Sequence, residues 1–263
     1  MPLNVLSAVA HGGPTRQTAP EMETLVPIPK RGRVFAGRRR IRLSDMDPSG
    51  RLRLDAVARF LQDVAIDDVA ETGWGTPKHL WFVRHIRMDV LAPFVEEREV
   101  ELSTWCSGLA TVAAGRRWSL TGEHGGRIEV DSVWIHLGPD ARPAGIQGFG
   151  LHADAAGDRR VSARPQLPDP PSDGPRAAWP LRATDVDLHG HVNNAVYWQA
   201  IEHLLLTGGP GVRRPFRARL DYREPIDLDD QLELATTATS DRLDAGFLTA
   251  DRLKAVASVA TLV

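Results

Sequence analysis

Cysteine is almost absent from this chain of 263 residues, which contains only Cys106. A single cysteine can form no disulfide within the chain and cannot build a cysteine-based metal site. It fits a reducing compartment, so we expect a cytoplasmic protein. Because Cys106 lies in an apolar, strand-like run, we interpret it as a small core residue rather than a nucleophile.

Positive charge is not in excess either. The chain has 32 Lys and Arg against 34 Asp and Glu, which gives a net charge of −2. Proteins that bind nucleic acid need a strongly basic surface, so we expect no nucleic-acid partner. Two arginine clusters form either a solvated strand edge or a docking patch for an acidic protein. Their members are Arg38, Arg39 and Arg40, and Arg213, Arg214, Arg217 and Arg219.

Long apolar runs are missing as well. We find no run of about 18 apolar residues, so we expect no membrane-spanning helix and no membrane partner. The start of the chain lacks the basic and apolar segments of a signal peptide. Residues 1–32 are rich in Pro, Gly and Thr, which predicts a flexible leader.

An internal repeat is the strongest structural signal. Residues 44–51 and 184–191 both read hydroxyl, Asp, apolar, Asp, two variable residues, Gly and a basic residue. The two segments are 140 positions apart (185 − 45). The segment 87–89 matches 219–221 at an offset of 132 (219 − 87). We therefore predict a duplicated unit of about 85–110 residues, a normal domain size.

Each copy shows a strand, a long helix and then further strands, which predicts an α+β fold with antiparallel sheets. Helices are expected at 53–72 and 193–207. Strands are expected at 33–43, 79–91, 97–108, 112–122 and 127–138, and at 177–184, 213–223, 230–240, 245–252 and 255–263. The predicted domains are 33–139 and 177–263. Residues 140–176 contain many prolines and are interpreted as a linker.

Residues 187–194 gather one carboxylate, two imidazoles and two amides immediately before the second helix. A helix N-terminus leaves backbone N–H groups unpaired and carries partial positive charge. It can therefore stabilise negative charge that develops on a carbonyl oxygen. Asn193 or Asn194 can also simply cap the helix.

Two histidines in this segment are specific to the second copy. Arg51 stands at the position of His191, and Ser49 at that of His189, so the fold does not require histidine at either place. Imidazole titrates near neutral pH and can act as a general acid or base. Asp187 has a counterpart in Asp47, which favours a structural role in the turn, although it could also orient a histidine.

Glu224 is also specific to the second copy, because its counterpart is Ala92. Strand alternation puts it on the same face as Leu220 and Tyr222, which should be buried. A carboxylate there is costly unless it is paired or used. It is therefore either a catalytic carboxylate or half of a salt bridge at the strand end.

Metal and cofactor signals are weak. The pair His189 and His191 is half of a ligand set, but zinc sites need three or four protein ligands. The sequence contains no Gly-rich phosphate loop and no dinucleotide fingerprint. We expect neither a metal nor a cofactor.

Residues 187–197 resemble the active-site segment of acyl-acyl-carrier-protein thioesterases, whose pattern is Asp-x-Asn-x-His-Val-Asn-Asn-x-x-Tyr. Residues 222–224, Tyr-Arg-Glu, resemble the second motif of the family, Tyr-Arg-x-Glu, shortened by one residue. The resemblance covers residues 33–263. It implies a tandem double hot-dog, in which each antiparallel sheet wraps around one long helix. The first copy would shape the acyl pocket and the second would carry the catalysis.

The resemblance further implies a catalytic set of Asp187, His191 and Glu224. His189 replaces the asparagine of the family, and an imidazole can still hydrogen-bond a water or a carboxylate. The implied reaction is hydrolysis of a fatty acyl thioester of acyl carrier protein, an acidic partner, to free acid and thiol. Glu224 would activate water or attack directly, and His191, helped by His189 and Asp187, would supply the proton.

The substrate is expected to lie between the start of the second helix and the first helix, in a monomer or a homodimer. The residues predicted to contact it are Asn193, Asn194, Tyr197, Phe60, Leu61 and Val64. Three alternatives remain open: an acyl-CoA thioesterase, a hydratase or dehydratase of the same fold, and a non-catalytic acyl-binding protein.

Overall fold

The computed structural model describes residues 25–262 except 75–79, 171–173, 208–214 and 251. Most of the leader expected at 1–32 lies outside the described residues. Residues 25–32 are described, and the backbone C=O of Val26 accepts a hydrogen bond from the Arg117 side chain.

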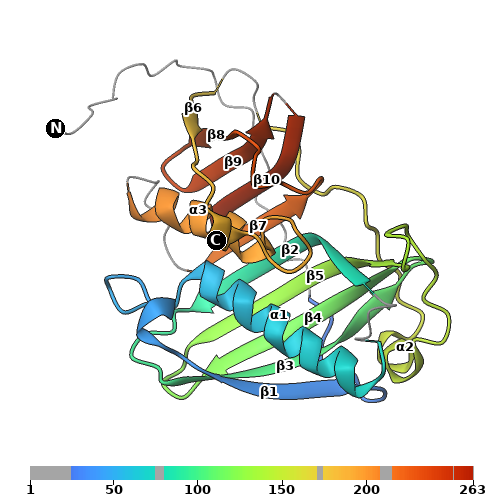
Figure 1. The fold of residues 1–263 in the computed structure, drawn as a ribbon. Coiled ribbons are helices and arrows are strands. Elements are labelled where there is room, and N and C mark those ends of the chain that lie inside the picture. The colour runs from blue at the N-terminus through green and yellow to red at the C-terminus, as the bar shows by residue number, and fades with distance from the viewer. Residues whose placement is uncertain (1–24, 75–79, 171–173, 208–214, 251, 263) are drawn as a thin grey trace, which may run out of the picture.

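The described strands form one antiparallel sheet in the order β1-β3-β4-β5-β2-β7-β10-β9-β8-β6 (Figure 1). Followed outward from the junction of β2 and β7, the two halves have the same strand order. This is the duplicated α+β unit that the repeat and the element order predict, and the double hot-dog that the resemblance implies. The strands are β1 (Val34–Arg40), β2 (Leu80–Ala92), β3 (Glu99–Leu109), β4 (Ala113–Gly122), β5 (Arg127–Leu137), β6 (Arg176–Ala178), β7 (Phe216–Tyr222), β8 (Leu232–Ala238), β9 (Arg242–Thr249) and β10 (Arg252–Thr261).

The two copies join through β2 and β7. Arg87 lies directly opposite Arg219 in this antiparallel pair, and these two residues are equivalent in the repeat. Equivalent residues face each other only where a two-fold axis passes between them, so the copies are related by an internal pseudo-two-fold. A single cluster of buried apolar side chains runs through both copies. The chain therefore folds around one continuous core.

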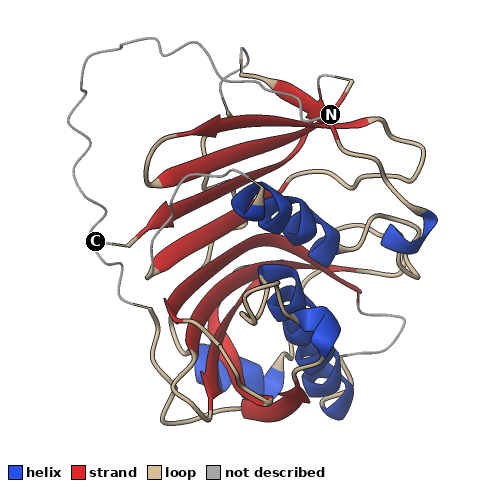
Figure 2. Cartoon of the chain, turned by 90° about the vertical axis from the view of Figure 1, so that its left-hand side faces the viewer, coloured by secondary structure: helices blue, strands red, loops and turns tan. Residues whose placement is uncertain are grey.

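Two long helices, α1 (Leu54–Glu71) and α3 (Asn194–Leu206), lie against the same face of the sheet and contact each other (Figure 2). Helical spacing puts Val57, Leu61 and Val64 of α1 on one face, and all three are buried. α1 ends at Glu71 with Thr72 as its C-cap, and the next residue, Gly73, adopts a φ of 77° that favours glycine. In the part of the chain that the structure describes, no helix is long and apolar enough to cross a bilayer.

The segment between the copies packs against the protein. It contains a short helix, α2 (Gly150–Ala156), that the proline-rich composition did not predict. Phe149 and the end of α2 bury themselves in a second apolar cluster with Cys106 and Trp81. The backbone N–H groups of residues 166 and 167 donate to the Asp221 carboxylate on β7. Phe149 and α2 therefore form one wall of the first copy, while residues 166 and 167 attach the connector to the second copy.

A buried charge network connects α1 to this wall. The Asp68 carboxylate accepts hydrogen bonds from the side chains of Arg33, Arg116 and His152. Burial alone would raise the pKa of Asp68, but hydrogen bonds from His152 and Arg33 and the charge of Arg116 hold it well below its ordinary value.

Replacing Asp68 with Asn should lower the free energy of unfolding by about 3 kcal/mol at pH 7, because it leaves buried cations without their anion. A carboxyl whose pKa is lowered by folding stabilises above its unfolded pKa of 3.8 and loses that contribution as pH falls below it. Urea unfolding of parent and variant should therefore converge below about pH 4. A difference that stays constant down to pH 2 would contradict this role.

The described members of the two arginine clusters mostly pair within the chain. Arg38 binds Glu99 and Glu101, and Arg39 binds Asp63 and Asp67. Arg217 donates to Asp89. Arg213 and Arg214 lie outside the described residues. The ion pairs argue against a docking patch. The first cluster lies on the edge strand β1, as a solvated strand edge requires, whereas Arg217 and Arg219 lie on β7 in the middle of the sheet, so a strand edge is not confirmed for the second cluster.

Candidate active site

The segment before α3 forms the same turn as its counterpart before α1. The Asp187 Oδ1 atom accepts the backbone N–H of His189 at 2.9 Å, as Asp47 Oδ1 accepts that of Ser49 at 2.8 Å. Gly190 has a φ of 82° in this turn, a conformation that a side chain would strain. Asp187 therefore has the structural role that the repeat predicts, and its carboxylate is held in place.

Asn193 links this turn to α3. Its Oδ1 atom accepts the backbone N–H of Ala195 at 2.9 Å, and its Nδ2 atom donates to Asp187 Oδ2 at 3.0 Å. Tyr222 on β7 holds the first turn of α3 in place, because its hydroxyl donates to the backbone C=O of Asn194. Among the described residues, the backbone N–H of Asn194 has no hydrogen-bond partner. It is thus available to an oxygen in front of the helix.

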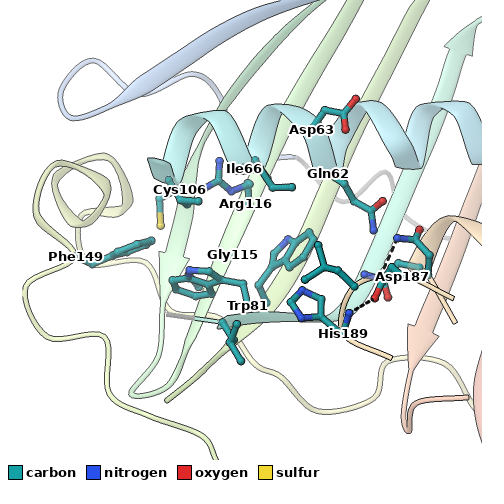
Figure 3. A pocket seen from close by; sticks show the side chains of 18 residues that line it. Gln62, Asp63, Ile66, Trp81, Cys106, Gly115, Arg116, Phe149, Asp187 and His189 are labelled. Carbon is teal, nitrogen blue, oxygen red and sulfur yellow. Dashed lines mark hydrogen bonds between the residues drawn. The ribbon is translucent and has the colours of Figure 1, made fainter. Parts of the chain in front are cut away.

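A cavity of about 680 Å³ opens in front of this turn, within the usual size range of small-molecule sites. Its walls come from α1, from strands β2 to β5, from Phe149 and from the turn before α3 (Figure 3). The lining residues are Gln62, Asp63, Ala65, Ile66, Val69, Leu80, Trp81, Cys106, Ala114, Gly115, Arg116, Trp134, Phe149, Asp187, Leu188, His189, Asn193 and Asn194.

The two ends of the cavity differ in chemistry. Gln62, Asp187 and His189 gather at one end, whereas Cys106 and Phe149 lie at the other (Figure 3). Burial raises the pKa of the Cys106 thiol to about 11, so it is protonated and unreactive at neutral pH. Between the ends, Ile66, Trp81 and other apolar side chains line the wall. A long apolar chain can occupy this space with its reactive group at the Asp187 end.

Four of the predicted site residues line the cavity: Asp187, His189, Asn193 and Asn194. His191 does not. Its Nδ1 atom lies 2.7 Å from Asp227 Oδ1, and its side chain is 48% exposed. The ring thus faces an exposed carboxylate next to the turn.

Glu224 also lies outside the cavity wall. Its carboxylate binds Arg252 at 2.7 Å and approaches Lys254, and the hydrogen bond from Arg252 is the main reason its pKa is lowered. The expectation of a buried face was wrong. β7 ends at Tyr222, and the N–H groups of Arg223 and Glu224 both bind the Lys254 C=O, so the alternation stops before Glu224.

The predicted acyl contacts on α1 need a correction. Phe60, Leu61 and Val64 are buried in the core and do not line the cavity. Tyr197 is likewise buried, in contact with Tyr222 and Phe247. Helical spacing identifies the face of α1 that packs on the sheet, whereas the cavity lies along its flank. That flank presents Gln62, Asp63, Ala65, Ile66 and Val69.

One group among the described residues has the composition of a metal site. Glu97, in the loop before β3, lies close to Glu123 and His124 in the turn after β4. The Glu97 carboxylate already accepts the backbone N–H groups of His124 and Gly126, which accounts for its position. The group is separate from the cavity wall.

Comparison with known proteins assigns the family. The sequence model of the acyl-ACP thioesterase N-terminal domain matches residues 32–145, and that of the C-terminal domain matches residues 170–260. The chain belongs to the acyl-ACP thioesterase family. Its activity is accordingly that of a thioester hydrolase.

Relatives of this chain occur in bacteria and plants. It is 32% identical to an uncharacterized protein of Mycobacterium tuberculosis, over 89% of this chain and 94% of that protein. It is 24% identical to oleoyl-acyl carrier protein thioesterase 1 of Arabidopsis thaliana, over 72% of this chain and 59% of that protein.

Solved structures share the fold. An acyl-ACP thioesterase from Bacteroides thetaiotaomicron superposes with a TM-score of 0.73 at 16% identity, over 86% of this chain and 97% of that one. The 12:0-ACP thioesterase from Umbellularia californica gives a TM-score of 0.69 at 18% identity, over 86% of this chain and 96% of that one. At these identities the likeness supports the double hot-dog alone.

Proposed function

We propose that the protein hydrolyses fatty acyl thioesters of acyl carrier protein in the cavity, with Asp187 and His189 as the acid–base pair. The observation that carries this proposal is the position of both side chains in the wall of one apolar cavity, beside the uncapped N–H of Asn194. The acidic carrier protein and a cytoplasmic location are part of the same proposal.

In this reaction the thioester carbonyl oxygen accepts the N–H of Asn194, and the N-terminus of α3 stabilises its developing charge. Asp187 takes a proton from water as the water oxygen attacks the carbonyl carbon. The C–S bond then breaks, and His189 gives a proton to the leaving sulfur. The proton held by Asp187 restores that of His189, so free acid and thiol are the only products.

This assignment moves the acid–base steps from His191 and Glu224 to Asp187 and His189. His191 and Glu224 each bind an exposed partner outside the cavity wall. Their side chains join neighbouring segments instead, His191 to Asp227 and Glu224 to Arg252. The first copy supplies most of the wall that the acyl chain contacts.

Thiol release from acyl-carrier-protein and acyl-CoA thioesters of graded chain length tests the function. Only hydrolysis yields free thiol, so this assay also separates a hydrolase from a hydratase or an acyl-binding protein. The ratio of kcat/KM for the two carriers decides between carrier protein and CoA. Release from no substrate would overturn the proposal.

His189→Ala should lower kcat by about 10²–10³-fold, the range for one proton-transfer group. His191→Ala is the matched comparison, because it removes an imidazole two residues away that lies outside the cavity, and it should cost less than about tenfold. Steady-state kinetics on one acyl-carrier-protein substrate measures both. A larger loss in His191→Ala would return that residue to the catalytic set.

A further inference from the structure

Helices α1 and α3 contact each other across the internal pseudo-two-fold, so that the middle of each lies near the start of the other. Glu202 is the ninth residue of α3, and its Oε1 atom accepts the backbone N–H of Leu54, the first residue of α1, at 2.6 Å. Arg53, the residue that precedes α1, supplies no side-chain cap. The N-terminus of α1 is therefore capped from the other copy.

The repeat identifies the reciprocal contact. At the offset of 140, Glu202 corresponds to Gln62 (202 − 62) and Leu54 corresponds to Asn194 (194 − 54). Gln62 is the ninth residue of α1, as Glu202 is of α3. It lines the cavity together with Asn194 and extends toward Asp187 (Figure 3). The pseudo-two-fold therefore brings the Gln62 amide to the space in front of α3.

In the first copy that space is closed. The Glu202 carboxylate fills it, and Arg51 neutralises the carboxylate with two hydrogen bonds of 3.0 and 2.7 Å. Both side chains are buried. The carboxylate oxygen stands at the place that corresponds to the carbonyl oxygen in the second copy, where His191 replaces Arg51. One chain thus has one open site and one filled site.

Neutrality distinguishes Gln62 from Glu202. A carboxylate at Gln62 would accept the Asn194 N–H that the thioester needs, and it would repel Asp187. The amide is uncharged and does not repel Asp187, and among the described residues it leaves the Asn194 N–H unpaired. It offers both a donor and an acceptor. Gln62 is half-buried, and in the part of the chain that the structure describes its side chain has no hydrogen-bond partner. Both of its polar atoms are free to bind a ligand.

On the basis of the proposed hydrolysis, we infer that Gln62 of the first copy is a catalytic residue of the second copy's site. Its amide oxygen accepts a hydrogen bond from the attacking water, and its NH2 group donates to the thioester. The amide orients the water but takes no proton, which passes to Asp187. The active site is thus composite, and the first copy contributes to the chemistry as well as to the acyl wall.

Gln62→Met keeps the length of the side chain and removes its hydrogen bonds. It should lower kcat by about 10–100-fold and change KM by less than about threefold, because the lost contact is made to the water and the reacting group. Asp67→Asn is the control, since Asp67 lies on the same helix outside the cavity, and it should retain the parent kcat. Thermal unfolding of each variant reports whether it is folded.

Gln62→Glu gives the sharper readout. The new carboxylate should occupy the N-terminus of α3 as Glu202 occupies that of α1, and should lower kcat more than Gln62→Met does, without lowering the melting temperature. The ratio of parent kcat to Gln62→Glu kcat should decrease as pH falls toward about 4.3, the ordinary pKa of glutamic acid, because protonation removes the charge of the new carboxylate. A purely structural side chain would produce no such pH dependence.

The outcomes separate the two proposals. If the parent releases no thiol, the proposed function and this inference both fail. If the parent is active and folded Gln62→Met keeps kcat within about twofold, only the inference fails. An increase of kcat in Gln62→Glu would also overturn it, because a carboxylate there would then act as a base.

Discussion

Asp187→Asn should abolish most of the thioesterase activity, with kcat lowered by about 10²–10⁴-fold. An amide at this position cannot take the proton of the attacking water. Its oxygen can still accept the backbone N–H of His189, so the turn before α3 should persist. The lost hydrogen bond from Asn193 costs about 1 kcal/mol of stability, far less than the chain needs to unfold. The measurement is single-turnover hydrolysis of an acyl-carrier-protein thioester.

Glu224→Gln is the matched control, because it also exchanges a carboxylate for an amide. Glu224 binds Arg252 and Lys254 outside the cavity wall, so its replacement should lower kcat by less than about tenfold. The comparison decides between two assignments of the base. A collapse in Glu224→Gln with an active Asp187→Asn would show that Glu224 reaches the substrate and would overturn the assignment to Asp187.

Arg51→Met should produce the largest loss of stability, about 3–5 kcal/mol in the free energy of unfolding. Arg51 is 6% exposed and binds Asp47 at 2.9 Å and Glu202 at 2.7 Å. Without its guanidinium, two buried carboxylates lie close together with no cation between them. Equilibrium unfolding in urea measures the effect. The slope of the free energy against urea concentration should match that of the parent, which shows that both unfold to similarly exposed states.

The double variant Arg51→Met with Glu202→Gln tests the mechanism. Removing the charge of Glu202 should restore a large part of the loss, because an amide can still cap α1 without carrying an unpaired charge. Equal losses in the single and double variants would mean that Arg51 stabilises mainly through packing. Neither variant changes a residue of the cavity wall, so kcat of the folded protein should stay near the parent value.

The sequence predicted the fold well because the signals of the fold are local. Alternation and helical spacing located the helices at 53–72 and 193–207, against the observed Leu54–Glu71 and Asn194–Leu206. The repeat, at offsets of 140 and then 132, predicted two equivalent units. It could not predict α2, because a seven-residue helix in a proline-rich segment is stabilised by the apolar cluster under it.

For the site, the sequence identified the segment 187–194 through its density of polar groups and its copy-specific histidines. The resemblance put His191 in the catalytic set, whereas His189 is the histidine that lines the cavity. These two rings are separated by one turn residue, and only the path of the chain around Gly190 puts the first in the cavity wall and the second beside Asp227.

The repeat makes Gln62 the counterpart of Glu202. Only the contact between α1 and α3 in the structure shows that Gln62 lies at the start of α3. The sequence by itself determined the strands, the helices, their duplication and the polar side chains from which a site could be built. The tertiary structure alone decided which of these groups share a cavity. Burial and distance between remote segments depend on how the sheet brings them together, and no local pattern encodes that.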